Sequence, residues 1–514
     1  MNRSDKSIKN ITTAFVCQAI GILVSFFARY FFIKTLGSEY LGVSGLFTNI
    51  LSVLTLTELG VGEAIIFSLY KPLAENDIKK TQMLMQLYKK IYTIIGIVIL
   101  IVGVLLTPFL NFFIKDTPNI SHLGIIYILF VVNTAISYFF SFKKNLIIAD
   151  QKKYITTLYR YGFYIGLNII QVIYLLTYKN YIGFLVLQII STFLENYFIS
   201  KKADKMYPYL KDKSKYKLDN DSKKQITKNT KAMMMHKVGG VVVNSTDNIL
   251  LSSFVSIVSV GIYSNYYLIT SSLNTIYSQI FGSITASVGN LCATTSKEKQ
   301  YEVYQNILFM NFWLYSFSAI CLSVLFNPFI KIWVGDKYLF NSGIVYVLVL
   351  NFYFTGLRKV SLTFREASGL FYVDRWKAVI EALVNLVSSI VLVINFGIIG
   401  VFIGTLISTL FVSAWIEPFV LYKYEFKVSF IEFIKKYVCY FIITLLLATF
   451  IITISNCING NIYISFITKL LICAIVPNAI YYIIFKNTKE FKYFLTLFKS
   501  KILNKIGRKK NESK

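Results

Sequence analysis

The stretch Lys201–Lys231, KKADKMYPYLKDKSKYKLDNDSKKQITKNTK, divides the chain. It is the longest polar run before the C-terminal tail, and it carries eleven lysines. Long apolar runs with few charges stand on both sides of it. A soluble linker between two membrane-embedded halves is the simplest reason for such an interruption. The stretch therefore predicts two bundles of helices joined by a basic segment.

The composition of the chain sets its class. Of its 514 residues, 55% are hydrophobic and only 15% are charged, so the chain has too little polar surface to cover itself in water. The net charge of +28 does not predict a nucleic-acid partner, because the basic residues alternate with apolar runs as they do in cytoplasmic loops. The six cysteines form no CxxC pair, and no metal site or other cofactor is expected.

The apolar runs predict an all-α polytopic membrane protein. A helix needs about 20 mostly apolar residues to cross the hydrocarbon of a bilayer. By this measure the chain has fourteen spans, at 11–34, 40–66, 91–114, 123–142, 154–178, 181–200, 232–255, 259–290, 305–330, 343–364, 376–396, 398–421, 437–456 and 461–485.

The distribution of Lys and Arg predicts the orientation of these spans. With the N-terminus inside, the segments on the cytoplasmic side hold 42 of the 53 basic residues, and the outer loops hold five. Positive residues are enriched on the cytoplasmic side of membrane proteins. Both termini are therefore expected in the cytoplasm. Between the second and third spans, the loop 71–90 has the pattern of an amphipathic helix at the inner membrane interface.

Two short segments predict that the halves are related. SFKKNLIIADQKKY (141–154) follows the fourth span, and TFREASGLFYVDRWK (363–377) follows the tenth. Each has an aromatic residue, basic residues, an Asp and a second basic cluster. A chance similarity between two short inner loops is the alternative explanation. Six spans per half would form a parallel repeat. The predicted regions are a first lobe at 1–200, a linker at 201–231, a second lobe at 232–422, an extra helix pair at 423–485 and a basic tail at 486–514.

The chain resembles a known family in the following segments: Ser38–Leu51, Glu58–Ile65, Ser68–Glu75, Thr246–Ser252, Val260–Tyr266, Arg365–Phe371 and Trp415–Pro418. These segments are similar to those of the Wzx-type polysaccharide flippases, in the superfamily that also contains the MATE drug exporters and the lipid II flippase. The resemblance implies a multi-pass protein of a bacterial or archaeal cytoplasmic membrane. Such a protein moves undecaprenyl-diphosphate-linked oligosaccharide units to the outer leaflet by alternating access, with a polysaccharide polymerase and assembly proteins as candidate partners.

Charged residues inside the spans are candidates for function, because a charge in lipid is costly without a partner or a water-filled cavity. Arg29 and Asp247 lie about 15 to 18 residues into the first and seventh spans. These two spans are equivalent in the repeat, and the family resemblance implies that both line the central cavity. Glu417 and several other charges lie near the cytoplasmic interface, where snorkelling explains much of the set.

The cargo of a flippase with a diphosphate predicts cations in the cavity. Arginine stays protonated and can bind phosphate oxygens through two parallel hydrogen bonds. Arg29 is the first candidate, with Arg160, Lys237 and Arg358 nearer the inner mouth. For each arginine, a structural ion pair is an equally good explanation.

Acidic and polar residues suggest how transport is driven and how sugar is bound. Asp247 could bind H⁺ or Na⁺, or it could fix a helix contact; Glu58 and Glu63 flank a pair of glycines and are further candidates for coupling or gating. The eighth span is too polar to face lipid on all sides, so it is expected to line the cavity, with polar packing between helices as the alternative. Its candidate residues are Asn265, Tyr266, Asn274 and Gln279.

Other functions are weighed against this hypothesis. An enzyme of the polymerase or ligase type normally needs a large outer loop, and every outer loop here is short, so no catalytic residue is expected. A MATE-like, cation-coupled exporter of drugs is the nearest alternative. Fourteen spans and a cationic cavity favour an anionic substrate over a cationic drug. The basic segments of the chain are also expected to contact anionic membrane lipids.

Overall fold

The computed structural model describes residues 3–58, 61–116, 118, 120–211, 240–241, 243, 245–370, 373–458 and 460–496. For residues 3–8, 57, 63, 140, 211 and 286 it describes the backbone alone. Most of the predicted linker and the end of the basic tail therefore lie outside the described residues.

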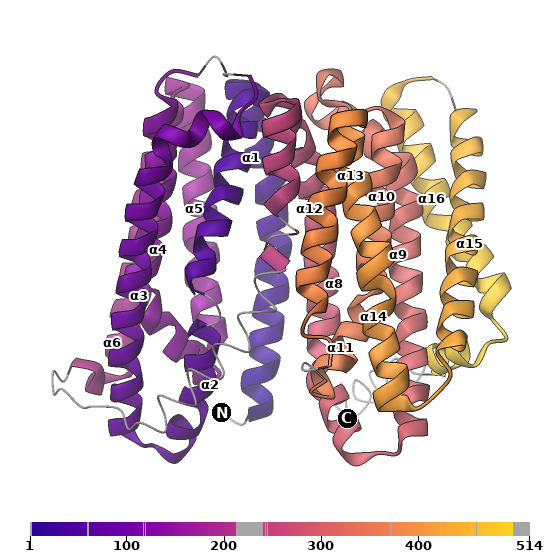
Figure 1. Cartoon of the computed structure of the whole chain (residues 1–514), viewed down its shortest axis with the longest axis horizontal. Helices are drawn as coiled ribbons and strands as arrows, with labels where there is room; N and C mark the ends of the chain where they lie inside the picture. Colours follow the sequence, from indigo (N-terminus) through magenta and orange to yellow (C-terminus); the bar gives the residue numbers. More distant parts are fainter. Residues whose placement is uncertain are drawn as a thin grey trace, which may run out of the picture. The chain divides into compact units, whose positions relative to one another are not determined.

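The described part of the chain is helical and contains no strand, which confirms the predicted all-α class (Figure 1). Short 3₁₀ or π segments adjoin several of the helices. The α-helices are α1 (Arg3–Leu54), α2 (Val61–Glu75), α3 (Ile78–Leu106), α4 (Leu123–Ala149), α5 (Lys153–Tyr178), α6 (Tyr181–Met206), α8 (Ile257–Thr294), α9 (Lys297–Val334), α10 (Ser342–Leu357), α11 (Lys359–Ala367), α12 (Lys377–Phe396), α13 (Ile398–Ser408), α14 (Ala414–Val420), α15 (Phe430–Asn456) and α16 (Ile462–Phe485).

The length and apolar character of these helices identify a multi-pass membrane protein. Within the described ranges, ten helical segments are long and apolar enough to cross a membrane, and the bent helix α4 makes an eleventh. Helix α8 is not among them, because Ser, Thr, Asn and Gln recur along its 38 residues. The prediction of fourteen spans stays a prediction.

Helix α1 covers the first predicted span and part of the second. It is continuous except at Gly37, whose φ of 87° and ψ of −172° are not helical. Glycine adopts a positive φ without the steric cost that a Cβ would add. The break lies between the predicted spans 11–34 and 40–66. The second of these is shorter than predicted, because a 3₁₀ turn at Thr55–Glu58 ends the helix.

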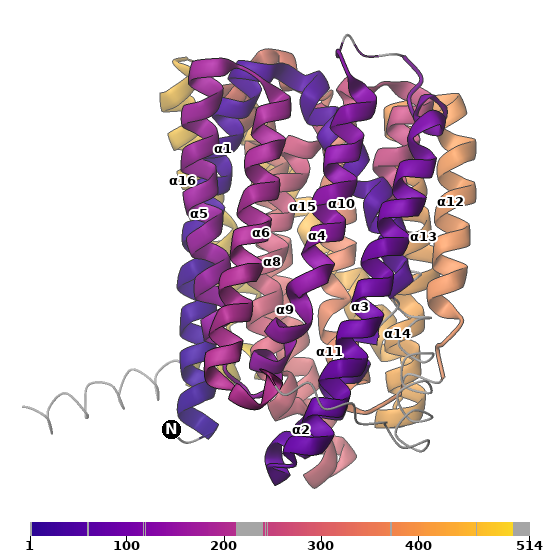
Figure 2. The same ribbon diagram turned by 90° about the vertical axis from the view of Figure 1, so that its left-hand side faces the viewer.

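The helices form two compact units. Unit 1 comprises Met1–Ile276 and Ala378–Thr405, and unit 2 comprises Tyr277–Lys377 and Leu406–Lys514. In unit 1, α4 packs against both α3 and α6, and α1 packs along α5 (Figure 2). In unit 2, α9 packs against α10, α15 and α16 (Figure 1). The division into lobes at 1–200 and 232–422 stays a prediction.

Two glycines let α1 and α8 approach closely within unit 1. A Cβ built on Gly42 would lie 2.0 Å from the carbonyl oxygen of Ile257, and one on Gly261 would lie 2.2 Å from that of Ser38. Small residues allow helix backbones to come together in this way. The crossing holds the polar helix α8 beside the helix that carries Arg29.

We expect Gly42→Ala to destabilise unit 1. The added methyl group would meet backbone atoms, which cannot move aside as a flexible side chain can. Overpacking of this kind costs about 1–3 kcal/mol. Thermal melting of the purified protein in detergent should therefore show a lower midpoint. Gly282→Ala on α8 is the control, since a Cβ there would meet nothing within 4 Å; equal midpoints for the two variants would contradict the prediction.

The loop 71–90 differs from its prediction as a single amphipathic helix. Helix α2 ends at Glu75, and α3 begins at Ile78 and continues as a span. Asn76 has a φ of 55°, and the side chain of Asp77 accepts a hydrogen bond from the backbone N–H of Lys80 at 2.9 Å. This N-cap starts a new helix where the amphipathic pattern predicted none.

Candidate functional site

Arg29 lines a polar cavity in unit 1. The cavity measures about 320 Å³ and lies among α1, α5, α6 and α8. The Arg29 side chain is half-buried, and its Nη1 donates a hydrogen bond to Ser264 Oγ at 3.0 Å. Among the described residues no carboxylate pairs with this guanidinium. The other polar residues of the lining are Ser25, Ser44, Tyr164, Asn168, Gln171 and Gln188.

Arg160 lines a second cavity of the same unit. This cavity measures about 430 Å³, and Arg160 is exposed at its edge. Helix α8 supplies Ser271, Ser272 and Thr275 to the lining, so hydroxyl groups dominate one wall. Two of the four predicted cations therefore lie on neighbouring cavities of unit 1.

The two cavities adjoin each other. Ser25, Tyr164 and Leu268 line both of them. Ser25 donates its hydroxyl proton to the carbonyl oxygen of Gly21, which leaves Tyr164 as the donor in the 2.6 Å hydrogen bond between Tyr164 and Ser25. A polar path thus runs along α5 from Arg160 to the neighbourhood of Arg29.

Helix α8 lines this path with residues other than those predicted. Ser264, Leu268, Ser271, Ser272 and Thr275 share one face of the helix, at spacings of three or four residues. The predicted residues lie elsewhere. Asn265 and Tyr266 are buried and line neither cavity, and Asn274 and Gln279 do not line them either.

Asp247 lies in a separate polar cluster of unit 1. The residue is 9% exposed, and its Oδ1 accepts a hydrogen bond from Thr405 Oγ1 at 2.8 Å. Asn385 Nδ2 in turn donates to Thr405 Oγ1 at 3.0 Å. In the described part of the chain no cation pairs with Asp247. A buried carboxylate with neutral partners alone is costly, and binding a proton or a cation lowers that cost.

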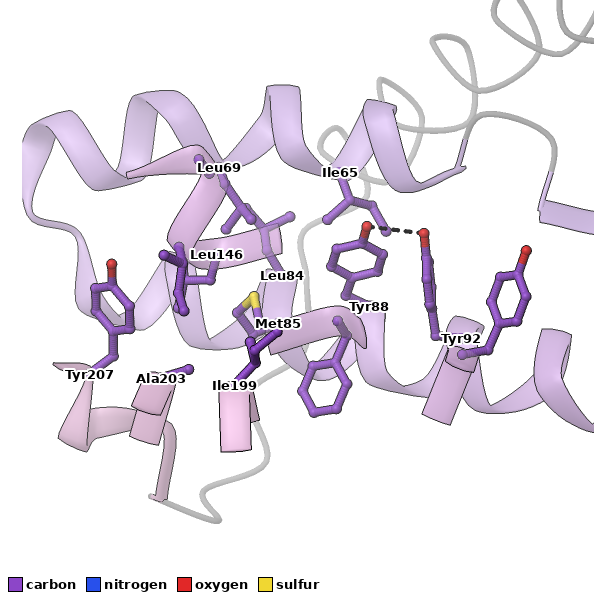
Figure 3. Close-up of a cluster of buried hydrophobic side chains, with 14 of the residues drawn as sticks. Ile65, Leu69, Leu84, Met85, Tyr88, Tyr92, Leu146, Ile199, Ala203 and Tyr207 are labelled. Carbon is purple, nitrogen blue, oxygen red and sulfur yellow. Dashed lines mark hydrogen bonds between the residues drawn. The ribbon is translucent and has the colours of Figure 1, made fainter. Parts of the chain in front are cut away.

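Glu58 joins a chain of hydroxyl groups in the core of unit 1. Its carboxylate accepts hydrogen bonds from Tyr92 and, at 3.1 Å, from Tyr138. Tyr88 donates to the Tyr92 hydroxyl at 3.2 Å (Figure 3). The Asn145 side chain donates to Tyr88. The surrounding core consists of buried apolar side chains from α2, α3, α4 and α6. Glu58 therefore lies in a structural core apart from the residues that line the two cavities.

Arg358 is held by a fully buried acid in unit 2. Its Nη2 and Nε donate to the two carboxylate oxygens of Glu417 at 2.8 and 3.1 Å, and Lys377 Nζ donates to the same carboxylate at 2.5 Å. The Glu417 side chain is 0% exposed. The snorkelling explanation for Glu417 was therefore wrong. Of the two explanations for Arg358, this geometry favours the structural ion pair.

Two predicted residues cannot be placed. Lys237 lies outside the described residues, and for Glu63 only the backbone is described, within α2. In the ranges that the structure covers, no group of three His, Cys, Asp or Glu side chains could hold a metal ion.

Comparisons with known proteins identify the fold. No family model and no curated protein sequence matches the chain. The lipid II flippase MurJ, in an inward closed conformation, is similar in structure with a TM-score of 0.69 at 16% identity, covering 92% of this chain and 99% of that chain. An inward-facing multidrug resistance MATE family transporter of the MOP superfamily has a TM-score of 0.63 at 13% identity, covering 78% and 95%.

A third similar structure is a MOP superfamily transporter from Pyrococcus furiosus, with a TM-score of 0.54 at 15% identity, covering 79% of this chain and 93% of that chain. The three likenesses show that the protein has the fold of the MOP superfamily transporters. This fold includes both a lipid flippase and drug exporters, so the likenesses alone do not assign a cargo.

Proposed function

We propose that the protein flips undecaprenyl-diphosphate-linked oligosaccharide units across the cytoplasmic membrane by alternating access, for the synthesis of a cell-surface polysaccharide. The observation that carries this proposal is Arg29, a guanidinium in a polar cavity that no carboxylate among the described residues contacts. A diphosphate offers the oxygens that such a group binds, and a low-dielectric site strengthens the attraction. The protein would then act as a transporter and would catalyse no covalent step.

The lining of the two cavities supports a sugar-bearing cargo. Serine and threonine hydroxyls and the amides of Asn168, Gln171 and Gln188 are donors and acceptors for sugar hydroxyls. A drug exporter for cations would instead need acidic groups, and none of the described residues that line the two cavities is acidic. The structural likeness to MurJ, which covers more of this chain than the likeness to the MATE transporter, agrees with a lipid-linked cargo.

Deletion of the gene tests this function. Undecaprenyl-linked intermediates would be extracted from the deletion strain, and surface polysaccharide would be stained. Complete lipid-linked units should accumulate while surface glycan is lost, and their sugars would identify the cargo. Unchanged surface glycan together with altered resistance to cationic drugs would contradict the proposal and favour a MATE-like exporter.

Asp247 is proposed as the residue that couples transport to H⁺ or Na⁺. In Asp247→Asn the amide keeps the shape and the contact with Thr405 but cannot carry the charge that binds a cation. We expect flipping by the reconstituted protein to lose its response to an imposed ion gradient. The control is Thr405→Val, which removes the hydroxyl and keeps the acid. If Asp247→Asn responds to the gradient as the wild type does, the residue has a structural role instead.

A further inference from the structure

Two adjoining cavities in unit 2 form a site that is both polar and apolar. A polar cavity of about 150 Å³ lies near the end of α9, the beginning of α10 and the end of α15. An apolar cavity of about 380 Å³ lies farther along the same three helices. Ser323, Tyr346 and Ile452 line both, so the polar cavity leads into the apolar one.

Two polar groups in the lining of the polar cavity have no hydrogen-bond or ion-pair partner among the described residues. Lys469 lies eight residues beyond the N-cap of the apolar helix α16, and in the described ranges no carboxylate contacts it. Ser455 is 2% exposed, and its Oγ has no hydrogen-bond partner in the part of the chain that the structure describes. A buried hydroxyl without a partner and a lysine inside a span are both costly. An anionic oxygen can accept a hydrogen bond from either kind of group.

The apolar cavity has the dimensions of a lipid chain. Its lining includes Val349, Leu350, Phe441, Leu445 and Ala448. From Asn456 to Phe441, α15 rises about 22 Å at 1.5 Å per residue. Half of the hydrocarbon layer of a bilayer is about 15 Å thick. A chain that starts at the polar end of α15 would therefore remain beside the two cavities through the whole of one leaflet.

We propose that the two cavities together bind one anionic phospholipid of the surrounding bilayer. Its phosphate lies between Lys469 and Ser455, and one acyl chain follows the apolar cavity between α10 and α15. Free phosphate would use only the polar end of the site, whereas a phospholipid satisfies both ends. The site belongs to unit 2 and is separate from the Arg29 cavity, so this inference does not depend on the cargo proposed above.

Native mass spectrometry of the full-length protein tests this site. The protein would be titrated with phosphatidylglycerol and with phosphatidylcholine of the same acyl chains. Lys469→Ala should weaken the binding of phosphatidylglycerol about tenfold, which corresponds to the loss of one charge-assisted hydrogen bond. Binding of phosphatidylcholine should change little. Lys486→Ala, at the other end of α16, is the matched control and should bind both lipids as the wild type does.

A second variant tests the apolar end. Ala448→Phe would place a ring in the cavity and should weaken the binding of both lipids, while thermal melting verifies that the variant is folded. Equal affinity of the Lys469→Ala and Lys486→Ala proteins for phosphatidylglycerol would overturn the proposal. Complete displacement of the lipid by millimolar inorganic phosphate would also overturn it, because it would identify a site for free phosphate.

Discussion

Cells that carry Arg29→Ala in place of the wild-type protein should lose surface glycan and accumulate complete lipid-linked units. The guanidinium contacts Ser264 and no acid among the described residues, so its donors are available for an anionic cargo. Loss of a bidentate contact with phosphate costs about 3 kcal/mol, which weakens binding about 100-fold. Arg29→Lys keeps the charge but loses the planar pair of donors, so export should be intermediate.

The controls separate this effect from a loss of folding. Lys34→Ala removes an exposed cation of the same helix that lines neither cavity, and export should remain normal. Arg160→Ala should reduce export less than Arg29→Ala, because Arg160 is exposed and water screens its charge. Membrane levels of each variant would be measured by immunoblot. Normal surface glycan in Arg29→Ala cells would remove Arg29 from the site.

Removal of Glu417 should have the largest effect on stability. In Glu417→Ala, Arg358 and Lys377 lose the carboxylate that both contact, and two mostly buried cations are left together. Breaking a buried pair in this way costs about 3–5 kcal/mol. We expect a much lower melting temperature in detergent and less protein in the membrane.

A double variant tests whether Arg358 and Glu417 are energetically coupled. Arg358→Met combined with Glu417→Gln removes both charges of the pair, so its cost should be smaller than the sum of the two single costs. Glu432→Gln is the surface control, because Glu432 is exposed and contacts Tyr301; its effect should stay within about 0.5 kcal/mol. Additive costs in the double variant would show that the pair is not coupled.

The class of fold was accessible from sequence because it follows from hydropathy and length. The lipid environment allows only helices or closed barrels, so runs of about 20 apolar residues predict spans directly. Hydrophobic periodicity led to a wrong prediction at the loop 71–90, because turn and N-cap residues within the loop start a new helix. Asn76 and Asp77 are typical residues for a turn followed by an N-cap, and this pair could have located the start of α3.

The site was only partly accessible from sequence. Arg29 was singled out by its depth in a span, and it does line a cavity. Tyr164, Asn168 and Gln171 of α5 were missed, although they recur at helical spacing with the predicted Arg160 and mark one face of that helix. Such a polar stripe in a span could have predicted them.

Pairings over long distances in sequence could not be predicted. Arg358 and Glu417 are 59 residues apart, and nothing in either local sequence shows that they meet. Depth in the membrane placed both near an interface and suggested snorkelling. Whether such a charge reaches water or an oppositely charged side chain depends on tertiary packing, which a single sequence does not reveal.

One hydrogen bond between two side chains, Tyr164 and Ser25, stands where the cavities of Arg29 and Arg160 meet. Rotation of either side chain would break this bond without a movement of the helix backbones. Rotations of single side chains take place much faster than the microsecond to millisecond motions of whole helices. If the proposed transport cycle depends on such helix motions, the boundary between the two cavities would open and close on a shorter timescale than the cycle itself.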